Sequence, residues 1–289
     1  MDETSSTNRT GQAPAPSRPA AGGTSVQLAA PPTGGRPEPD WHTDIPDLDA
    51  SGLQILRIPA GLWLRQPGGV DLSDDELCEE PPDKERMYVV LGAPGEQPPD
   101  PRSVADVLRA LPDGVRDDAV LCWYGGSQAA GAVAEALSAP VRAVHGVPSD
   151  GVLVFVDQDG VECWRPFVQE SVYRPAGPPR LTRWSSPPGL LQVEPGSFGL
   201  FDGWRVDVVP RGLLVRPESV RAMPAWGGGT GPTADVVVVP AEDVGVPIEV
   251  VIALDDVLRE LPEGTRQCLR LLPVDDIAAD ALAASEHAG

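Results

Sequence analysis

Two spacings of apolar residues alternate along most of this chain, and together they predict an α/β fold. Short apolar runs in "MYVVLGAPG" (87–95), "AVLCWYGG" (119–126) and "VRAVHG" (141–146) have the length of buried strands, and the first ends in a turn. The segments at 100–114 and 127–140, which lie between these runs, space their apolar or small residues as helices do. Strands that alternate with helices of this length predict right-handed crossovers and a mainly parallel sheet.

Turn residues between neighbouring apolar runs predict two β-hairpins. Residues 53–65 contain two apolar runs around a Pro-Ala-Gly turn, and residues 151–167 contain two around Asp-Gly, which is a strong hairpin signal. Residues 171–189 are extended and rich in proline, so we expect them to wrap the surface of the domain.

The chain repeats part of itself after about 150 residues, which predicts two related units. "VLRALPDGVR" at 107–116 and "VLRELPEGTR" at 257–266 are identical at seven of ten positions. "VVPRGLLVRP" at 208–217 matches "RIPAGLWLRQP" in the first hairpin, with proline, glycine, leucine and arginine in the same order. The repeated residues are those expected in turns and in the core, so the repeat indicates a shared scaffold and does not indicate a catalytic activity.

The repeat and the composition together predict three regions. Residues 1–50 are dominated by Pro, Gly, Ser, Thr and Ala, and we expect a disordered tail because they offer little apolar surface to bury. Residues 51–203 form the first α/β unit, and residues 204–289 form a second, incomplete unit that packs on the first. Each unit is expected to have a β-hairpin and a small, mainly parallel sheet with flanking helices.

The charge of the chain limits its partners. The formal net charge is −21, so the surface repels nucleic acid and anionic membranes and favours a basic protein partner, or serves solubility alone. The N-terminal residues lack a signal peptide, and no apolar run approaches the roughly 20 residues of a membrane helix. We therefore expect a cytoplasmic protein.

The sequence contains no motif for a metal or a cofactor. The four cysteines form no C-x-x-C pair and have no histidine at metal-ligand spacing, so we expect isolated, reduced thiols. The Gly-rich segments match neither the phosphate-binding loop nor the dinucleotide fingerprint. We therefore expect no bound metal and no cofactor.

The end of the strand predicted in "AVLCWYGG" (119–126) is the most promising place for a functional site, because open sheets bind ligands where parallel strands end. Cys122 and His145 end neighbouring predicted strands and form a candidate nucleophile–base pair. Against this pair, Cys122 lies inside an apolar run, where a core thiol fits better. Trp123, Tyr124, Gly125 and Gly126 are the candidate contacts with a protein partner.

Two resemblances accompany these residues. The layout of "AVLCWYGGS" resembles the strand–helix–strand unit of caspase-like cysteine peptidases and the CHAT group, which implies a nucleophile at Cys122. That pattern expects His-Gly at the end of the preceding strand, where this chain has "LGAPG". Segments 166–184 and 204–217 resemble parts of large actinobacterial proteins, some with polymorphic-toxin-like architecture. This second resemblance covers most of 53–217, and it implies a bacterial setting and no particular activity.

These observations support two hypotheses of different class. The first is a non-catalytic protein-interaction or accessory module of a bacterial system. The alternative is a divergent cysteine hydrolase that uses Cys122 and His145. An exposed, low-pKa Cys122 within reach of His145 favours the enzyme, and a buried thiol far from any base favours the module.

Overall fold

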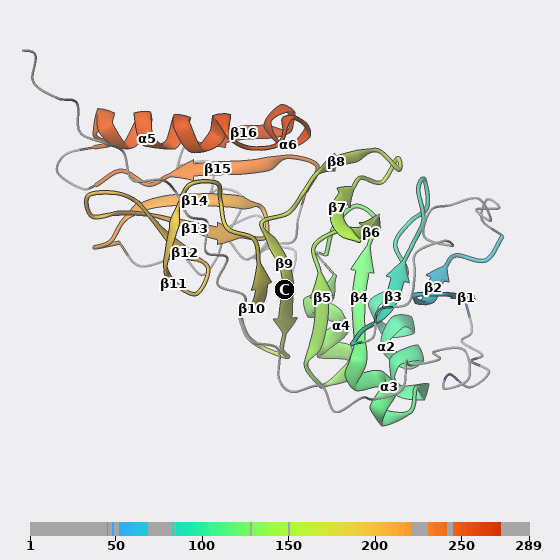
Figure 1. Ribbon diagram of the computed structural model, residues 1–289. Helices are drawn as coiled ribbons and strands as arrows, with labels where there is room; N and C mark the ends of the chain where they lie inside the picture. The colour runs from blue at the N-terminus through green and yellow to red at the C-terminus, as the bar shows by residue number, and fades with distance from the viewer. Residues whose placement is uncertain are drawn as a thin grey trace, which may run out of the picture. The chain divides into compact units, whose positions relative to one another are not determined.

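The structure of the protein is a computed structural model (Figure 1). It describes residues 45, 48, 52–68, 83, 85–127, 129–149, 151–220, 231–241 and 245–272. The chain divides into two compact units, Met1–Pro37 and Glu38–Gly289, and all described residues belong to the second. Most of the predicted disordered tail, and residues 273–289 at the end of the predicted second unit, therefore lie outside the described residues.

The first half of the described chain forms a seven-stranded mixed sheet, which confirms the predicted α/β class. Its spatial order is β1-β2-β3-β4-β5-β9-β10. The four strands from β2 to β5 are parallel to one another, and β1, β9 and β10 pair antiparallel to their neighbours. The bounds are β1 (Gln54–Ile58), β2 (Gly61–Arg65), β3 (Met87–Leu91), β4 (Ala119–Trp123), β5 (Val141–Val144), β9 (Val168–Tyr173) and β10 (Arg180–Trp184).

The helices of this half cover one face of the sheet. They are α2 (Pro101–Ala110), α3 (Asp113–Asp118) and α4 (Ala130–Leu137). The Asp100 side chain caps α2 by accepting hydrogen bonds from the N–H groups of Arg102 and Ser103. Apolar residues of α2 and α4 share one buried cluster with alternate residues of β2, β3, β4 and β5.

The opposite face carries a second buried cluster, which packs against a small three-stranded sheet. This sheet consists of β6 (Val147–Ser149), β7 (Val152–Val156) and β8 (Glu162–Trp164). Val147 of β6 and Val156 of β7 join the cluster. The antiparallel pairing of β7 with β8 confirms the hairpin predicted around Asp-Gly.

The proline-rich segment is more regular than the predicted surface wrap. Its beginning belongs to β9, and Arg180–Trp184 forms β10, which pairs antiparallel with β9 at the edge of the sheet. The two prolines before Arg180 precede the strand, so they remove no hydrogen bond from the ladder.

The second half forms a six-stranded sheet in the order β11-β12-β13-β14-β15-β16. The helices α5 (Ile248–Arg259) and α6 (Glu263–Gln267) connect β15 to β16, and Val250 and Leu254 of α5 pack in the cluster on one face. The strands are β11 (Leu191–Glu194), β12 (Ser197–Phe201), β13 (Trp204–Val209), β14 (Gly212–Pro217), β15 (Ala234–Val238) and β16 (Leu269–Leu272). The sheet thus begins with two strands that precede Trp204, where the sequence matches start.

The same order of pairings occurs in both halves. An antiparallel hairpin (β1–β2, β13–β14) is followed by two parallel strands (β3 and β4, β15 and β16) with two helices between them. Each hairpin turn contains a glycine, Gly61 or Gly212, with φ of 147° or 143°. A Cβ atom would lie 2.2 Å from the Tyr88 carbonyl oxygen at the first and 2.1 Å from the Asp235 carbonyl oxygen at the second. The neighbouring parallel strand therefore excludes any side chain at both turns.

Candidate functional site

The structure does not bring Cys122 and His145 together, because they face opposite sides of the sheet. Cys122 packs with Val120 and Val144 in the cluster beneath the small sheet. His145 instead contacts Ser127 and stands beside Tyr173, which belongs to the cluster on the helix-covered face. A nucleophile and its base must lie within hydrogen-bond reach, so this arrangement does not support the Cys–His hydrolase.

The environments of the two side chains agree with this placement. Cys122 is fully buried, and burial raises the pKa of its thiol far above the ordinary value. Burial lowers the pKa of His145 to about 3, although the Glu170 charge acts in the opposite direction. The thiol is therefore protonated and the imidazole neutral at pH 7, and neither is poised for nucleophilic chemistry.

His145 is the centre of a buried hydroxyl network. Its Nδ1 lies 3.0 Å from Ser127 Oγ, and its Nε2 lies 2.8 Å from Ser171 Oγ. Ser127 Oγ is also 3.5 Å from the Tyr173 hydroxyl. A neutral imidazole has one donor and one acceptor nitrogen, so one serine donates to the ring and the other accepts from it. The network joins the segment before α4 (Ser127), the residue after β5 (His145) and β9 (Ser171 and Tyr173).

The glycines that follow the parallel strands let the chain cover these strand ends itself. The N–H groups of Gly95, after β3, and Gly125, after β4, donate to the carbonyl oxygens of Gln158 and Val156. At Gly146, after β5, a Cβ atom would lie 2.7 Å from the Val154 carbonyl oxygen. The β7 strand and the turn after it therefore cross the strand ends, where open sheets commonly bind ligands.

The predicted contact residues 123–126 lie at the same place, and their side chains are packed inside. Trp123 is 3% exposed and belongs to the cluster on the helix-covered face, whereas Tyr124 is 7% exposed and belongs to the opposite one. The Tyr124 ring stacks on Trp63 at a centroid separation of 6.4 Å. Gly125 and Gly126 form a turn with φ of 77° and 107°. The two rings therefore contribute core packing, where the sequence predicts an exposed contact.

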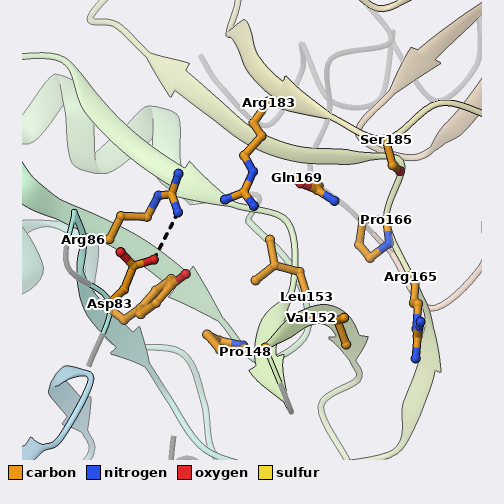
Figure 2. A pocket seen from close by; sticks show the side chains of 12 residues that line it. Asp83, Arg86, Pro148, Val152, Leu153, Arg165, Pro166, Gln169, Arg183 and Ser185 are labelled. Atoms are coloured by element: carbon orange, nitrogen blue, oxygen red, sulfur yellow. Dashed lines mark hydrogen bonds and ion pairs between the residues drawn. The ribbon is translucent and has the colours of Figure 1, made fainter. Parts of the chain in front are cut away.

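A different place has the geometry of a binding site. A pocket of about 480 Å³ opens between the start of β3, the β6–β7 turn and the β9–β10 hairpin (Figure 2). Three arginines line it, which is notable in a chain with a net charge of −21. We call it the arginine pocket; it is lined by Asp83, Arg86, Tyr88, Pro148, Gly151, Val152, Leu153, Arg165, Pro166, Gln169, Arg183 and Ser185.

A buried ion network fixes one wall of the arginine pocket. Glu170 is 4% exposed, and its carboxylate accepts hydrogen bonds from Arg142 Nε (3.1 Å) and Arg86 Nε (3.2 Å). Burial alone would raise the pKa of Glu170, but the hydrogen bond and charge of Arg142 and the charge of Arg86 outweigh burial and lower it. Arg86 also pairs with Asp83 at 3.1 Å. Its charge is therefore already balanced by two carboxylates.

The other two arginines of the pocket are exposed and have no ion-pair partner among the described residues. Figure 2 shows the Arg183 guanidinium directed into the pocket, between Arg86 and Gln169. Arg165 lines the far side, beyond Pro166. Burial and the nearby Asp83 charge raise the pKa of Tyr88, although Arg86 and Arg183 partly oppose them, so its phenol stays protonated and can donate a hydrogen bond.

Sequence reasoning misses this pocket because its residues come from four separate segments. Arg165 and Arg183 stand in the Asp-Gly hairpin and the proline-rich segment, which carry no motif for binding. The one sequence signal for this pocket is compositional: arginines are enriched between residues 165 and 183 of an otherwise acidic chain. Their convergence depends on the pairing of β9 with β10.

Comparisons with known proteins find no match among protein-family models, curated proteins or solved structures. Within the described residues, no group of three or more His, Cys, Asp or Glu side chains is placed to hold a metal ion. In that same part of the chain, none of the helices combines the length and the apolar character needed to span a bilayer.

Proposed function

We propose that this protein is a non-catalytic binding module of a bacterial system, and that its arginine pocket binds a carboxylate group of a protein partner. The observation that carries the proposal is the Arg183 guanidinium, which points into the pocket without a carboxylate partner among the described residues. Guanidinium groups bind carboxylates through two parallel hydrogen bonds, which are stronger than neutral ones.

The remaining lining of the pocket fits a carboxylate that is attached to an apolar body. Pro148, Leu153 and Pro166 supply an apolar wall, while Gln169 and Ser185 supply polar groups beside the arginines. Ligand sites of this kind combine apolar walls with a few placed polar groups. The rest of the surface is acidic, so it attracts a partner that is basic overall, and the pocket then selects one carboxylate on that partner.

We also infer that the two halves arose by duplication of one unit. The equivalent pairings, the two excluded side chains at the hairpin turns and the 107–116 and 257–266 match support this inference. Most of the lining of the arginine pocket comes from residues 148–185, a segment that has no counterpart among the described residues of the second half, and Asp83, Arg86 and Tyr88 add to it from the start of β3. The duplicated part is thus mainly scaffold, and the segment inserted between the copies supplies most of the proposed binding site. A cytoplasmic location stays a prediction.

The test uses peptides with one carboxylate in a basic context. The probe is the amidated, acetylated peptide Lys-Leu-Glu-Leu-Lys, its control replaces glutamate by glutamine, and glutarate and phosphate are titrated separately. Arginine Nε–Hε resonances of the labelled protein report binding. We expect the glutamate peptide to shift the Arg183 signal and the glutamine peptide to leave it unchanged.

Variants decide whether the pocket is responsible. Arg183→Gln should weaken binding of the glutamate peptide by roughly 10- to 100-fold, because hydrogen bonds to charged groups contribute about 1.5–3 kcal/mol. Arg180→Gln makes the same change in charge on the same strand, outside the pocket, and should leave affinity unchanged. Equal losses of affinity in both variants would show that binding depends on net charge alone and would refute the pocket as the binding site. If glutarate or phosphate binds as strongly as the peptide, the proposal that the ligand is a carboxylate of a protein partner is refuted.

A further inference from the structure

Two cysteines from different halves of the chain meet at one edge of the small sheet. Cys163 lies in β8, and Cys268 follows α6 directly before β16. The Cys268 thiol donates a hydrogen bond to the Cys163 carbonyl oxygen at 3.2 Å, across 105 residues of sequence. Both residues are partly exposed, unlike Cys122, which is fully buried.

The backbone holds both cysteines in place. Cys163 precedes Trp164, which is 2% exposed and stacks on Phe155 of the neighbouring strand. The Cys268 N–H donates to the Thr265 carbonyl oxygen at 3.2 Å, and Thr265 is itself buried. Both cysteine side chains pack against the same apolar cluster. Their proximity therefore follows from the packing of α6 on β8 and does not depend on the conformation of a loose loop.

The two thiols also interact electrostatically. Burial raises the pKa of Cys163 most, and the charges of Asp157 and of an ionised Cys268 raise it further, against a backbone hydrogen bond near Asp157 that lowers it. The Cys163 sulfur now donates to the Val161 carbonyl oxygen at 3.4 Å, which is a weak interaction. A disulfide with Cys268 would replace this weak hydrogen bond of the Cys163 sulfur.

We propose that Cys163 and Cys268 form a reversible disulfide that links the two halves of the fold. The oxidant is a small-molecule disulfide. The Cys268 thiolate attacks one of its sulfurs, forms a mixed disulfide and releases the first thiol. The Cys163 thiolate then attacks the Cys268 sulfur of that mixed disulfide and releases the second thiol. Two protein thiols lose two protons and two electrons, and the oxidant gains them as two small thiols.

The link would restrain a defined part of the molecule. It would tie the β7–β8 hairpin, which crosses the ends of the parallel strands, to α6 of the second half. Arg165 and Pro166 directly follow Trp164 and line the arginine pocket, so the same link would restrain one wall of that pocket. The disulfide itself does not depend on what the pocket binds.

The experiment treats the protein with oxidised glutathione at pH 8 and maps disulfides by mass spectrometry without reduction. All samples carry Cys78→Ser, which removes the cysteine outside the described residues. We expect one intramolecular crosslink between the peptides that contain Cys163 and Cys268, and a Tm higher by roughly 10 °C, because the bond closes a loop of about 100 residues. Cys163→Ser and Cys268→Ser should each abolish the crosslink and the Tm shift.

The formation rate gives a second readout. Because the pKa of Cys163 is raised, crosslinking should be slower at pH 7 than at pH 9, and dithiothreitol should reverse it fully. Three results would overturn the proposal: stable glutathione adducts on both cysteines without a crosslink, a crosslink that forms only between molecules at high concentration, or a crosslink that includes Cys122. Two single variants are used so that one poorly folded variant does not decide the outcome.

Discussion

Replacing Glu170 by glutamine should cost the fold more than any other conservative change of a charged residue around the arginine pocket. Glu170 joins β9 to Arg86 before β3 and to Arg142 on β5, and Thr182 Oγ1 on β10 donates to Oε1 at 3.1 Å. The amide keeps the size of the side chain but removes the negative charge and one acceptor. The guanidinium groups of Arg86 and Arg142 then both lose the carboxylate that balances their charge.

The magnitude follows from the exposure of the partners. Breaking a fully buried ion pair by removing one partner costs about 3–5 kcal/mol. The side chain of Arg86 is 15% exposed and that of Arg142 is 31% exposed, so water recovers part of this cost. Arg86 also keeps Asp83 as a partner. We therefore expect Glu170→Gln to lower the free energy of unfolding by about 2–4 kcal/mol at pH 7.

The pH dependence separates charge from packing in this variant. The pKa of Glu170 is lower in the folded chain, so its ionised form stabilises the fold above the unfolded-state value of about 4.3. This stabilisation is lost as the pH falls through the folded-state value. The difference between the parent and Glu170→Gln should therefore shrink between pH 5 and pH 3.

Urea unfolding, followed by tryptophan fluorescence at pH 7 and at pH 3, measures both effects. Glu135→Gln is the matched control, because Glu135 is exposed on α4 and has no ion-pair partner among the described residues; it should change stability by less than about 0.5 kcal/mol. The reasoning fails if Glu170→Gln costs as little as this control, or if its cost is the same at both pH values.

Three further predictions concern the scaffold and the cysteines. Gly61→Ala and Gly212→Ala should each lower the free energy of unfolding by more than about 3 kcal/mol, and Tm with it, because the new Cβ would meet the backbone of the next strand. Gly114→Ala is the control: Gly114 lies on helix α3 with open space around it, so this change should leave Tm unchanged or slightly raised. His145 should show no titration by NMR between pH 5 and 8, and stability should fall as the pH drops below about 6.5, because the unfolded chain binds the proton that the folded ring refuses. Iodoacetamide should label Cys122 only at the rate of unfolding, so fast labelling at pH 7 would contradict its burial.

Much of the fold could be predicted because periodicity and turn chemistry act locally. The run at 87–91, the helix after Asp100 and the hairpin around Asp-Gly all form where the sequence predicts them. The prediction for residues 171–189 missed β10 because of the prolines. The sequence alone did not show that Pro178 and Pro179 lie in the connection between β9 and β10, at the edge of the sheet. The strands β11 and β12 were missed although turn dipeptides mark both of their ends, Pro195-Gly196 between them and Asp202-Gly203 before β13.

The site could not be predicted to the same extent, because it depends on register. The pairing of Leu121 with Ala143 places Cys122 beside Val144 and leaves His145 on the other face. A shift of one residue between β4 and β5 would have brought the two candidates to the same side. The sequence correctly predicted that the ends of these two strands are neighbours, but it did not show on which face of the sheet each side chain lies. The arginine pocket depends in addition on the long-range pairing of β9 with β5 and β10.

The position of β7 explains why binding would move to the arginine pocket. In an open parallel sheet, the strand ends are the natural place for a ligand, because loops and helix N-termini converge there. Here the N–H groups of Gly95 and Gly125 donate to carbonyl oxygens of the hairpin, and Gly146 leaves room for the Val154 backbone, so the hairpin occupies the place of a ligand. The same hairpin continues into Arg165 and Pro166, and its β6–β7 turn supplies Gly151. The segment that covers the strand ends thus also lines the arginine pocket beside them, where Arg183 lacks a carboxylate partner among the described residues.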